Sequence, residues 1–311
     1  MRVQRQGIAQ HVQDAQPAEQ RHHAGLSRTA IAGILLLTLS VLFATLPLML
    51  MVINAHQESG AIDEHTLAVE QLAKQETERE LREAHAYNAK LFEHGSRALG
   101  EVSDPWASSG VTLSQTDSDY QHQLDIPDDG VMATIRYPRL GINLPIRHGT
   151  GDTVLSSGAG HVYGTSLPVG GSNTHAVISA HSGYDRLMFD ALSMWQARKG
   201  DYFYITVLGT LLSYRVSDIQ IIEPDDFTHF AITAGRDEVT LLTCTPYGVN
   251  TKRLIVTGER VGIPPAPNPD TVPAAHPQYW LIIGVIIAWL LFMLFVIAFV
   301  MKHRKERKVE G

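Results

Sequence analysis

Two long stretches without a charged residue constrain the fold of this 311-residue chain more than any other feature. The first covers residues 30–53 and the second covers residues 280–301. A helix needs about 20 apolar residues to cross the hydrocarbon core of a bilayer, and both stretches reach that length. Pro47 lies inside the first stretch, and a membrane helix tolerates proline better than a soluble helix does. We therefore predict two transmembrane helices, at residues 30–53 and 280–301, with a large segment between them.

The charges beside the two stretches predict which side of the membrane each segment occupies. Residues 54–70 and 261–279 contain no Lys or Arg, whereas the opposite flanks are basic, with Arg2, Arg5, Arg21 and Arg28 before the first stretch and Lys302, Arg304, Lys305, Arg307 and Lys308 after the second. Because basic residues stay in the cytoplasm, we expect both termini to be cytoplasmic and the middle segment to be extracellular, in a two-span protein of the cell membrane. A cleaved signal peptide is the alternative for residues 30–53, but its apolar core would be only about 7–15 residues long.

Charge and cysteine content exclude several classes of function. The formal net charge is −7, and basic residues gather at the C-terminus, so the chain lacks the broad basic surface of a nucleic-acid-binding protein. The only cysteine is Cys244, which excludes an internal disulfide and a multi-cysteine zinc site.

The middle segment divides into a helical part and a part rich in strands. Residues 61–94 contain no Gly or Pro and are rich in Glu, Gln, Ala and Leu, which predicts one long helix. Residues 95–129 are dense in Ser, Asp and Gly and predict a loop. From Val131 onward apolar and polar residues alternate, and we predict eight short strands, at residues 131–137, 143–146, 174–180, 201–208, 211–217, 219–222, 238–243 and 253–259. With only one short helix among them, near residues 186–195, these strands predict a mainly-β barrel or sandwich.

Cys244 is the candidate nucleophile. It ends a predicted strand and precedes a turn, although most free cysteines are simply small buried hydrophobic residues. Arg253 begins the next strand, and pairing of the two strands would bring its guanidinium beside the thiol, where it favours a thiolate and can donate hydrogen bonds to an oxyanion. His181, which ends another predicted strand, is the best candidate for the acid that protonates a leaving group. Its competitors are His148, His161 and His175.

These residues lie in sequence blocks that resemble the sortase family. Residues 240–244, Thr-Leu-Leu-Thr-Cys, match the family's T-L-x-T-C signature, and Arg253 and His181 stand at the family's spacing from the cysteine. Other blocks of the resemblance are Gly-His-Val-Tyr-Gly-Thr-Ser-Leu-Pro-Val-Gly-Gly at residues 160–171, Thr-His-Ala-Val at 174–177 and Thr-Pro-Tyr-Gly-Val-Asn at 245–250. The resemblance extends from about residue 120 to about residue 260.

The resemblance implies a mainly-β fold. This is an eight-stranded sortase-type β-barrel with a few short helices, an N-terminal helix and the two transmembrane helices. Together with the predicted spans, it divides the chain into seven segments. They are a cytoplasmic tail (residues 1–29), a transmembrane helix (30–53), an extracellular helix and lid region (54–119), a catalytic barrel (120–262), a proline-rich linker (263–279), a second transmembrane helix (280–301) and a basic cytoplasmic tail (302–311).

One short motif resembles the class C branch of the family, which assembles pili. Asp104-Pro105-Trp106 is similar to the lid of that branch. The resemblance implies that Asp104 pairs with Arg253 and that Trp106 covers Cys244, so that the lid inhibits the resting enzyme. The second transmembrane helix and its basic tail also resemble class C.

The family resemblance implies a cysteine transpeptidase that needs neither cofactor nor metal. Cys244 would attack the Thr–Gly bond of an LPXTG-type sorting signal in a pilin or surface-protein precursor. Arg253 would stabilise the oxyanion, and His181 would protonate the leaving amine. A lysine of an acceptor pilin would then take the acyl group as an isopeptide bond. The alternative within the family is a housekeeping or class E-like sortase that anchors surface proteins to the cell wall.

Three other interpretations make different demands on the sequence. A surface protein that is itself a sortase substrate would carry an LPXTG motif before the second span, and residues 272–279 contain none. A different cysteine acyltransferase, such as an L,D-transpeptidase, would not need the T-L-x-T-C block with its downstream arginine. A membrane scaffold with an inactive barrel would not need Cys244, His181 and Arg253 together.

Overall fold

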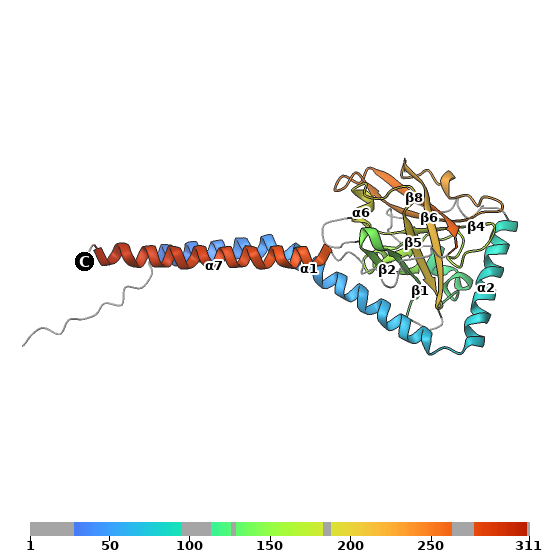
Figure 1. Cartoon of the computed structure of the whole chain (residues 1–311), viewed down its shortest axis with the longest axis horizontal. Helices are drawn as coiled ribbons and strands as arrows, with labels where there is room; N and C mark the ends of the chain where they lie inside the picture. The colour runs from blue at the N-terminus through green and yellow to red at the C-terminus, as the bar shows by residue number, and fades with distance from the viewer. Residues whose placement is uncertain (1–27, 95–112, 126–128, 183–187, 263–276, 310–311) are drawn as a thin grey trace, which may run out of the picture. The chain divides into compact units, whose positions relative to one another are not determined.

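The structure is a computed structural model that describes residues 28–94, 113–125, 129–182, 188–262 and 277–309 (Figure 1). The chain divides into two compact units, of which one contains residues 1–41 and 289–311 and the other contains residues 42–288. The larger unit contains a β-barrel and the helices that pack on it.

Two of the described helices are long and apolar enough to cross a membrane. They are α1 (Arg28–Glu70) and α7 (Pro277–Val309), and they contain the predicted spans. Large apolar side chains are exposed along both helices, among them Leu36 at 68% and Leu294 at 62%. Because removal of apolar side chains from water lowers the free energy, such outward apolar surfaces fit a lipid environment. The orientation of the two helices across a membrane stays a prediction.

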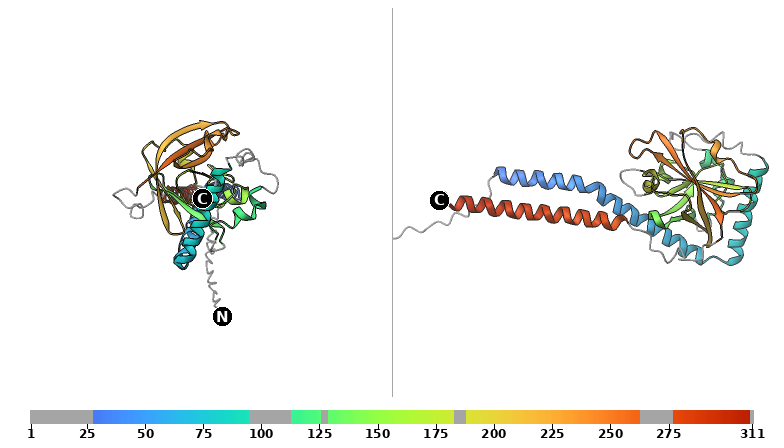
Figure 2. Two further views of the ribbon diagram at one scale, coloured as in Figure 1. Left: turned by 90° about the vertical axis from the view of Figure 1, so that its right-hand side faces the viewer. Right: turned by 45° about the horizontal axis from the view of Figure 1, so that its top comes forward.

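Eight strands close into a barrel (Figure 2). Their order around the barrel is β1-β2-β3-β4-β7-β8-β6-β5. Neighbouring strands are antiparallel, except that β2 pairs with β3 and β4 pairs with β7 in parallel. The predicted barrel is therefore confirmed over the sandwich. The strands are β1 (Val131–Tyr137), β2 (Ile142–His148), β3 (Ala159–His161), β4 (Thr174–Ser179), β5 (Tyr202–Val207), β6 (Thr210–Ile222), β7 (Asp237–Thr245) and β8 (Lys252–Val261).

The number of strands agrees with the prediction, but two of the elements differ. The strands predicted at residues 211–217 and 219–222 are one strand, β6, in which the register shifts between Val216 and Asp218. An irregularity of this kind interrupts the alternation of side chains, so the sequence pattern suggests two strands. The prediction also missed β3, because three residues are too few to show an alternation.

Apart from α1, α7 and the 20-residue helix α2 (Lys74–Glu93), the helices of the described residues are single turns. The helix predicted near residues 186–195 corresponds to α6, although residues 183–187 lie outside the described part of the chain. The loop predicted at residues 95–129 is wrong where two short helices form, and residues 95–112 and 126–128 are not described. The short helices are α3 (Leu113–Thr116), α4 (Ser118–Gln121), α5 (Asp152–Leu155), α6 (Asp190–Ser193) and the 3-10 helices η2 (Pro138–Leu140) and η3 (Thr228–Phe230).

Apolar side chains form one cluster inside the barrel and a second cluster on its outer face. Successive residues of a strand point to opposite faces, so Ile178 and Leu241 belong to the inner cluster while their neighbours Val177 and Leu242 belong to the outer one. The members of this outer cluster are Val162, Val177, Ile222, Phe230, Leu242 and Ile255. The outer face of β4, β7 and β8 is therefore buried as well as the inner face.

The single helix predicted for residues 61–94 is wrong, because the chain breaks between α1 and α2 (Lys74–Glu93). At the break Val69 and Leu72 pack against the barrel core, and Ala73 takes an extended conformation with φ −64° and ψ 133°. Burial of apolar side chains there outweighs the helix propensity on which the prediction depends. The C-terminal end of α1 and the start of α2 consequently meet at a corner (Figure 1).

One face of α2 attaches this helix to the barrel. Ala84 is fully buried on that face, and Leu81 and Tyr87 pack against the barrel core. The buried Asn88 side chain accepts a hydrogen bond from the N–H of Leu167 at 2.7 Å and donates one to the carbonyl of Leu167 at 3.0 Å. The amide thus satisfies both backbone groups of a buried residue in the segment between β3 and β4.

A buried polar network attaches α4 to β3. The Tyr120 hydroxyl lies 2.8 Å from Nδ1 of His161, and the ring's Nε2 lies 2.8 Å from the carbonyl oxygen of Ser166. A carbonyl can only accept, so Nε2 carries the proton. Burial lowers the pKa of His161 to about 4, which favours the neutral ring. In that ring Nδ1 accepts from the Tyr120 hydroxyl, whose oxygen accepts from the N–H of Gly149 at 3.0 Å.

We expect Asn88→Ala to destabilise the barrel by about 2–3 kcal/mol, because two buried backbone groups of Leu167 lose their partner. The measurement is the midpoint of denaturant unfolding of the detergent-solubilised chain, followed by circular dichroism. Lys90→Ala, at an exposed position two residues away on α2, is the control and should leave the midpoint unchanged. Equal midpoints for the two variants would contradict the assignment.

The neutral His161 ring should make stability depend on pH. The pKa of the His161 ring is lower in the folded state than in the unfolded state, where it is about 6.5. The stability that the neutral ring contributes is therefore fully present above about pH 6.5. Between pH 6.5 and 4 the unfolded chain binds a proton that the folded chain does not, and stability falls by up to about 1.4 kcal/mol per pH unit. We expect His161→Gln to be less stable at pH 7 but to lose stability less steeply on acidification. Parallel pH curves for the variant and the wild type would exclude this role.

Candidate active site

The candidate catalytic residues lie at one edge of the buried outer face. On β7, Cys244 follows Leu242 by two residues, and on β8, Arg253 precedes Ile255 by two residues. Since side chains alternate along a strand, both candidates share the face of the outer apolar cluster. Strand alternation alone therefore places the thiol and the guanidinium on one surface.

The strand register places Cys244 directly opposite Arg253. The two residues are Cα partners in the antiparallel pairing of β7 with β8, as the spacing in the sequence predicts. Both are largely buried, at 6% and 5% exposure. The Arg253 guanidinium also donates to the carbonyls of Asn250 and Lys252, each at 3.3 Å. Its cation is thus held by the β7–β8 turn beside the thiol.

His181 lies at the same edge because β4 and β7 are parallel, so their carboxyl ends meet there. Ser179 is the Cα partner of Leu242, and the N–H of Ala180 donates to the carbonyl of Leu242 at 3.2 Å. His181 is the next residue, is half-buried, and accepts a hydrogen bond from the N–H of Phe189 on its carbonyl at 3.0 Å. All three candidate residues are therefore brought to one edge of the barrel.

The hydroxyl groups around Cys244 fix its backbone. The Thr243 hydroxyl donates to the carbonyl of Ala180 at 2.9 Å, which ties β7 to the residue before His181. The carbonyl of Cys244 accepts from the hydroxyls of Ser182 at 3.1 Å and Ser193 at 2.7 Å. Sequence reasoning missed these contacts, although the second threonine of the T-L-x-T-C block was a visible signal for one of them.

The three competing histidines are engaged elsewhere. His161 is held by Tyr120 and Ser166 inside the fold, and Nε2 of His148 lies 2.8 Å from the carbonyl of Gln123. His175 lies on the outer face, but its partner Thr240 stands four positions before Cys244 on β7. Burial lowers the pKa of each of the three rings, which favours the neutral form. They do not replace His181 as the candidate acid.

The lid motif is not part of the described structure. Asp104 and Trp106 fall within residues 95–112, so their predicted contacts with Arg253 and Cys244 stay predictions. Among the described residues no group of three His, Cys, Asp or Glu side chains could hold a metal ion. The chemistry available at this edge is that of a thiol, an imidazole and a guanidinium.

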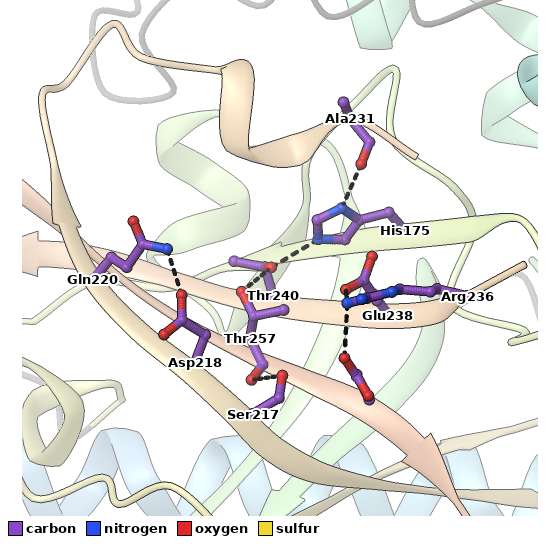
Figure 3. Close-up of polar contacts among 10 residues, drawn as sticks. His175, Ser217, Asp218, Gln220, Ala231, Arg236, Glu238, Thr240 and Thr257 are labelled. Carbon is purple, nitrogen blue, oxygen red and sulfur yellow. Dashed lines mark hydrogen bonds and ion pairs between the residues drawn. The ribbon is translucent and has the colours of Figure 1, made fainter. Parts of the chain in front are cut away.

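A chain of polar contacts crosses the same outer face and was also missed from the sequence (Figure 3). It joins His175 on β4, Thr240 on β7 and Thr257 on β8. The first threonine of the T-L-x-T-C block is its central member. A threonine between the apolar residues Val239 and Leu241 of β7 was the signal that could have revealed it.

Over the barrel, the chain is similar to known proteins of one family. The sortase domain profile matches residues 135–261. Sortase A of Streptococcus agalactiae serotype III is 32% identical over 155 residues, which cover 49% of this chain and 61% of that protein. The chain spans only 57–61% of the length of the first curated relatives that it matches.

Solved structures give a closer match. Sortase C-1 from Actinomyces oris is 44% identical to this chain, with a TM-score of 0.55. The match covers 60% of this chain and 99% of that one. A structure described as the pilus-related sortase C of Group B Streptococcus is 37% identical, with a TM-score of 0.57 and coverage of 64% and 96%. The identity, the near-complete coverage of these class C structures and the shared barrel agree with the sequence blocks around Cys244. The chain therefore belongs to the sortase family, whose members are cysteine transpeptidases.

Proposed function

We propose that this protein is a class C sortase that cleaves an LPXTG-type sorting signal between Thr and Gly and joins pilin subunits through a lysine isopeptide bond. The observation that carries the proposal is the direct cross-strand pairing of Cys244 with Arg253, at the edge where β4 delivers His181. The similarity to solved class C structures supports the choice of branch. No cofactor or metal takes part in the proposed reaction.

The first half-reaction forms a thioester. The Cys244 thiolate adds to the carbonyl carbon of the substrate threonine, and the carbonyl oxygen becomes an oxyanion. Arg253 stabilises this oxyanion by donating hydrogen bonds from a buried position, where such bonds are stronger than in water. The C–N bond to glycine then breaks, and the His181 imidazolium gives its proton to the leaving amine.

The second half-reaction reverses these roles. A lysine amine attacks the thioester, and neutral His181 takes the proton that the amine loses. The C–S bond breaks and releases the Cys244 thiolate, so the starting charges of the site return. An ordinary thiol with a pKa of about 8.5 is only a few per cent thiolate at neutral pH, so the reactive form is a minority unless a neighbouring cation favours it.

The lid is proposed to regulate access to this site. Asp104 would compete for Arg253, and Trp106 would cover the thiol in the resting enzyme. The motif stands in the segment that joins the N-terminal helices to the barrel, and Tyr120 of α4 attaches the end of that segment to His161 of β3. A carboxylate is suited to pair with a guanidinium, and a large aromatic ring is suited to cover a thiol.

The membrane arrangement is a further part of the proposal. Two apolar helices would hold the protein in the cell membrane, with both termini in the cytoplasm and the barrel outside, where pilin precursors pass. The domain boundaries drawn from the sequence serve this arrangement, with residues 120–262 as the catalytic part. The proposed partners are LPXTG-bearing pilins or surface-protein precursors and a pilin that provides the acceptor lysine.

A housekeeping sortase that anchors surface proteins to the cell wall is the second candidate. One observation favours it, namely that the matching curated relatives include proteins named Sortase A from three organisms. The two candidates differ in the acceptor amine, a pilin lysine in one case and a cell-wall amine in the other. An acceptor competition between a lysine-bearing pilin and a cell-wall peptide would separate them.

We expect the full chain in detergent to form a thioester with an LPXTG peptide. Intact mass spectrometry should find the acyl half of the peptide on Cys244, with the largest amount in an Asp104→Ala/Trp106→Ala variant. Cys244→Ala is the control and should carry no adduct. An unmodified enzyme in both lid states, with Cys244 still open to a small alkylating reagent, would count against an LPXTG-type donor. A Cys244 that stays inert even without the lid would count against the enzyme itself.

Thr243 should matter for turnover more than for thiol reactivity. Thr243→Val removes the bond to Ala180 and loosens the placement of His181, so we expect kcat to fall by about tenfold to a hundredfold, which is the usual effect of a displaced catalytic group. Thr243→Ser keeps the hydroxyl and should restore most of the rate. Alkylation of Cys244 should proceed at the same rate in both variants. Equal kcat values for the valine and serine variants would refute this positioning role.

A further inference from the structure

The polar chain of His175, Thr240 and Thr257 links three strands to one loop (Figure 3). Nδ1 of His175 lies 3.0 Å from the carbonyl oxygen of Ala231, and its Nε2 lies 2.8 Å from the hydroxyl of Thr240. The hydroxyls of Thr240 and Thr257 are 2.8 Å apart. His175 and Thr240 are buried, at 3% and 0% exposure. The Ala231 carbonyl, at one end of these polar contacts, belongs to the connection between β6 and β7.

The chemistry of the partners determines which atoms donate. The Ala231 carbonyl only accepts, so Nδ1 of His175 carries the proton. In the neutral ring, which burial favours, Nε2 then accepts from the Thr240 hydroxyl. The Thr240 oxygen is then left to accept from the hydroxyl of Thr257. Every group is satisfied with a neutral ring, which agrees with the lowering of the His175 pKa by burial. The arrangement defines one ring orientation and one tautomer.

The connection between β6 and β7, residues 223–236, lies over the outer face and is held at its start, middle and end. Lys252 pairs with Glu223 at its start, and the Arg236 guanidinium bonds Glu259 at 2.9 Å at its end. Near its end, the N–H of Gly235 also donates to the side-chain oxygen of Asn173 at 2.7 Å. In the middle, Phe230 of η3 is buried in the outer apolar cluster, and the next residue is Ala231. The bond from His175 is therefore the polar attachment of the middle of the connection.

This attachment and the reacting thiol share one surface. Thr240 and Cys244 are four residues apart on β7, which is about 13 Å along a strand, and both side chains point to the outer face. A peptide whose carbonyl reaches Cys244 approaches this face at its edge, because the face itself is buried beneath Phe230 of the β6–β7 connection. Movement of the connection at Ala231 would consequently change the space available to the peptide without moving the thiol.

We propose that His175, oriented by Thr240 and Thr257, is a positioning residue that holds the β6–β7 connection in place as a wall of the acyl-donor peptide site. The inference rests on the proposed function for the peptide, but the attachment itself is a property of the fold. It also gives a role to the first threonine of the T-L-x-T-C block. A buried polar chain specifies one geometry more strictly than the apolar packing around it.

Two substitutions of His175 test separately its bond to Ala231 and its bond to Thr240. His175→Asn puts an amide N–H in the place of Nδ1 and can keep the bond to Ala231, whereas His175→Gln extends its polar group toward Thr240 and loses that bond. We expect His175→Gln to raise KM for an LPXTG peptide about tenfold, as loss of one buried hydrogen bond does. Its kcat should change by less than twofold. His175→Asn should return KM close to the wild-type value.

Hydrogen–deuterium exchange of the full chain in detergent tests the attachment without any turnover. Amides of residues 227–233 should exchange about tenfold faster in His175→Gln, while those of β7 stay protected. Thr240→Val and Thr240→Ser form a second pair in case the His175 variants fold poorly, and only the valine variant should speed exchange. Ser217→Ala removes an exposed hydroxyl that bonds only the Thr257 carbonyl, so it is the control and should change nothing.

Each outcome bears on a different part of the inference. Unchanged exchange at residues 227–233 in both His175→Gln and Thr240→Val would overturn the attachment. Faster exchange with an unchanged KM would overturn the role of the connection as a wall of the peptide site. A fall in kcat at constant KM would assign His175 to the chemistry instead and would also overturn it. Faster exchange in a chain that processes no LPXTG peptide would keep the attachment and remove the proposed function.

Discussion

The register of β7 between β4 and β8 is the constraint on which the active site depends. Parallel pairing with β4 brings His181 to the carboxyl end of β7, and antiparallel pairing with β8 sets Arg253 opposite Cys244. A shift of one residue in either ladder would send a side chain to the opposite face of the sheet. The hydroxyl of Thr243 and the hydroxyls that bind the Cys244 carbonyl hold this register at the carboxyl end of β7, beside the candidate nucleophile.

Burial on both faces makes such precision possible. The inner face of β7 fills the barrel, and its outer face is covered by the apolar cluster around Phe230 and by the polar chain from His175. A strand that is buried on both sides has little freedom to slide, because every displacement exposes apolar area or leaves a polar group without its partner. The candidate catalytic residues thus stand at the end of a sheet that is buried on both faces, while the β6–β7 connection lies outside the strands.

Alternation of side chains was enough to predict most of the barrel, and its failures have local causes. The three residues of β3 are too few for a pattern, and the irregularity at Val216 divides β6 in the sequence. The break between α1 and α2 depends on Val69 and Leu72 packing against the barrel, which composition cannot reveal. At the site, spacing predicted that Cys244 and Arg253 would be neighbours. The bonds of Thr240 and Thr243 depend on partners more than 60 residues away.

A cross-strand disulfide tests the central claim, the register that joins Cys244 to Arg253. Opposite residues of an antiparallel pair have Cα atoms about 4.5–5.5 Å apart, within the range that a disulfide accepts. Because Cys244 is the only cysteine, Arg253→Cys creates one pair, and Leu254→Cys places the second thiol on the inner face instead. The account predicts that mild oxidation of the full chain in detergent removes both thiols of Arg253→Cys within one monomer and leaves Leu254→Cys reduced. Free thiols in the first variant, or a bond in the second, would contradict it.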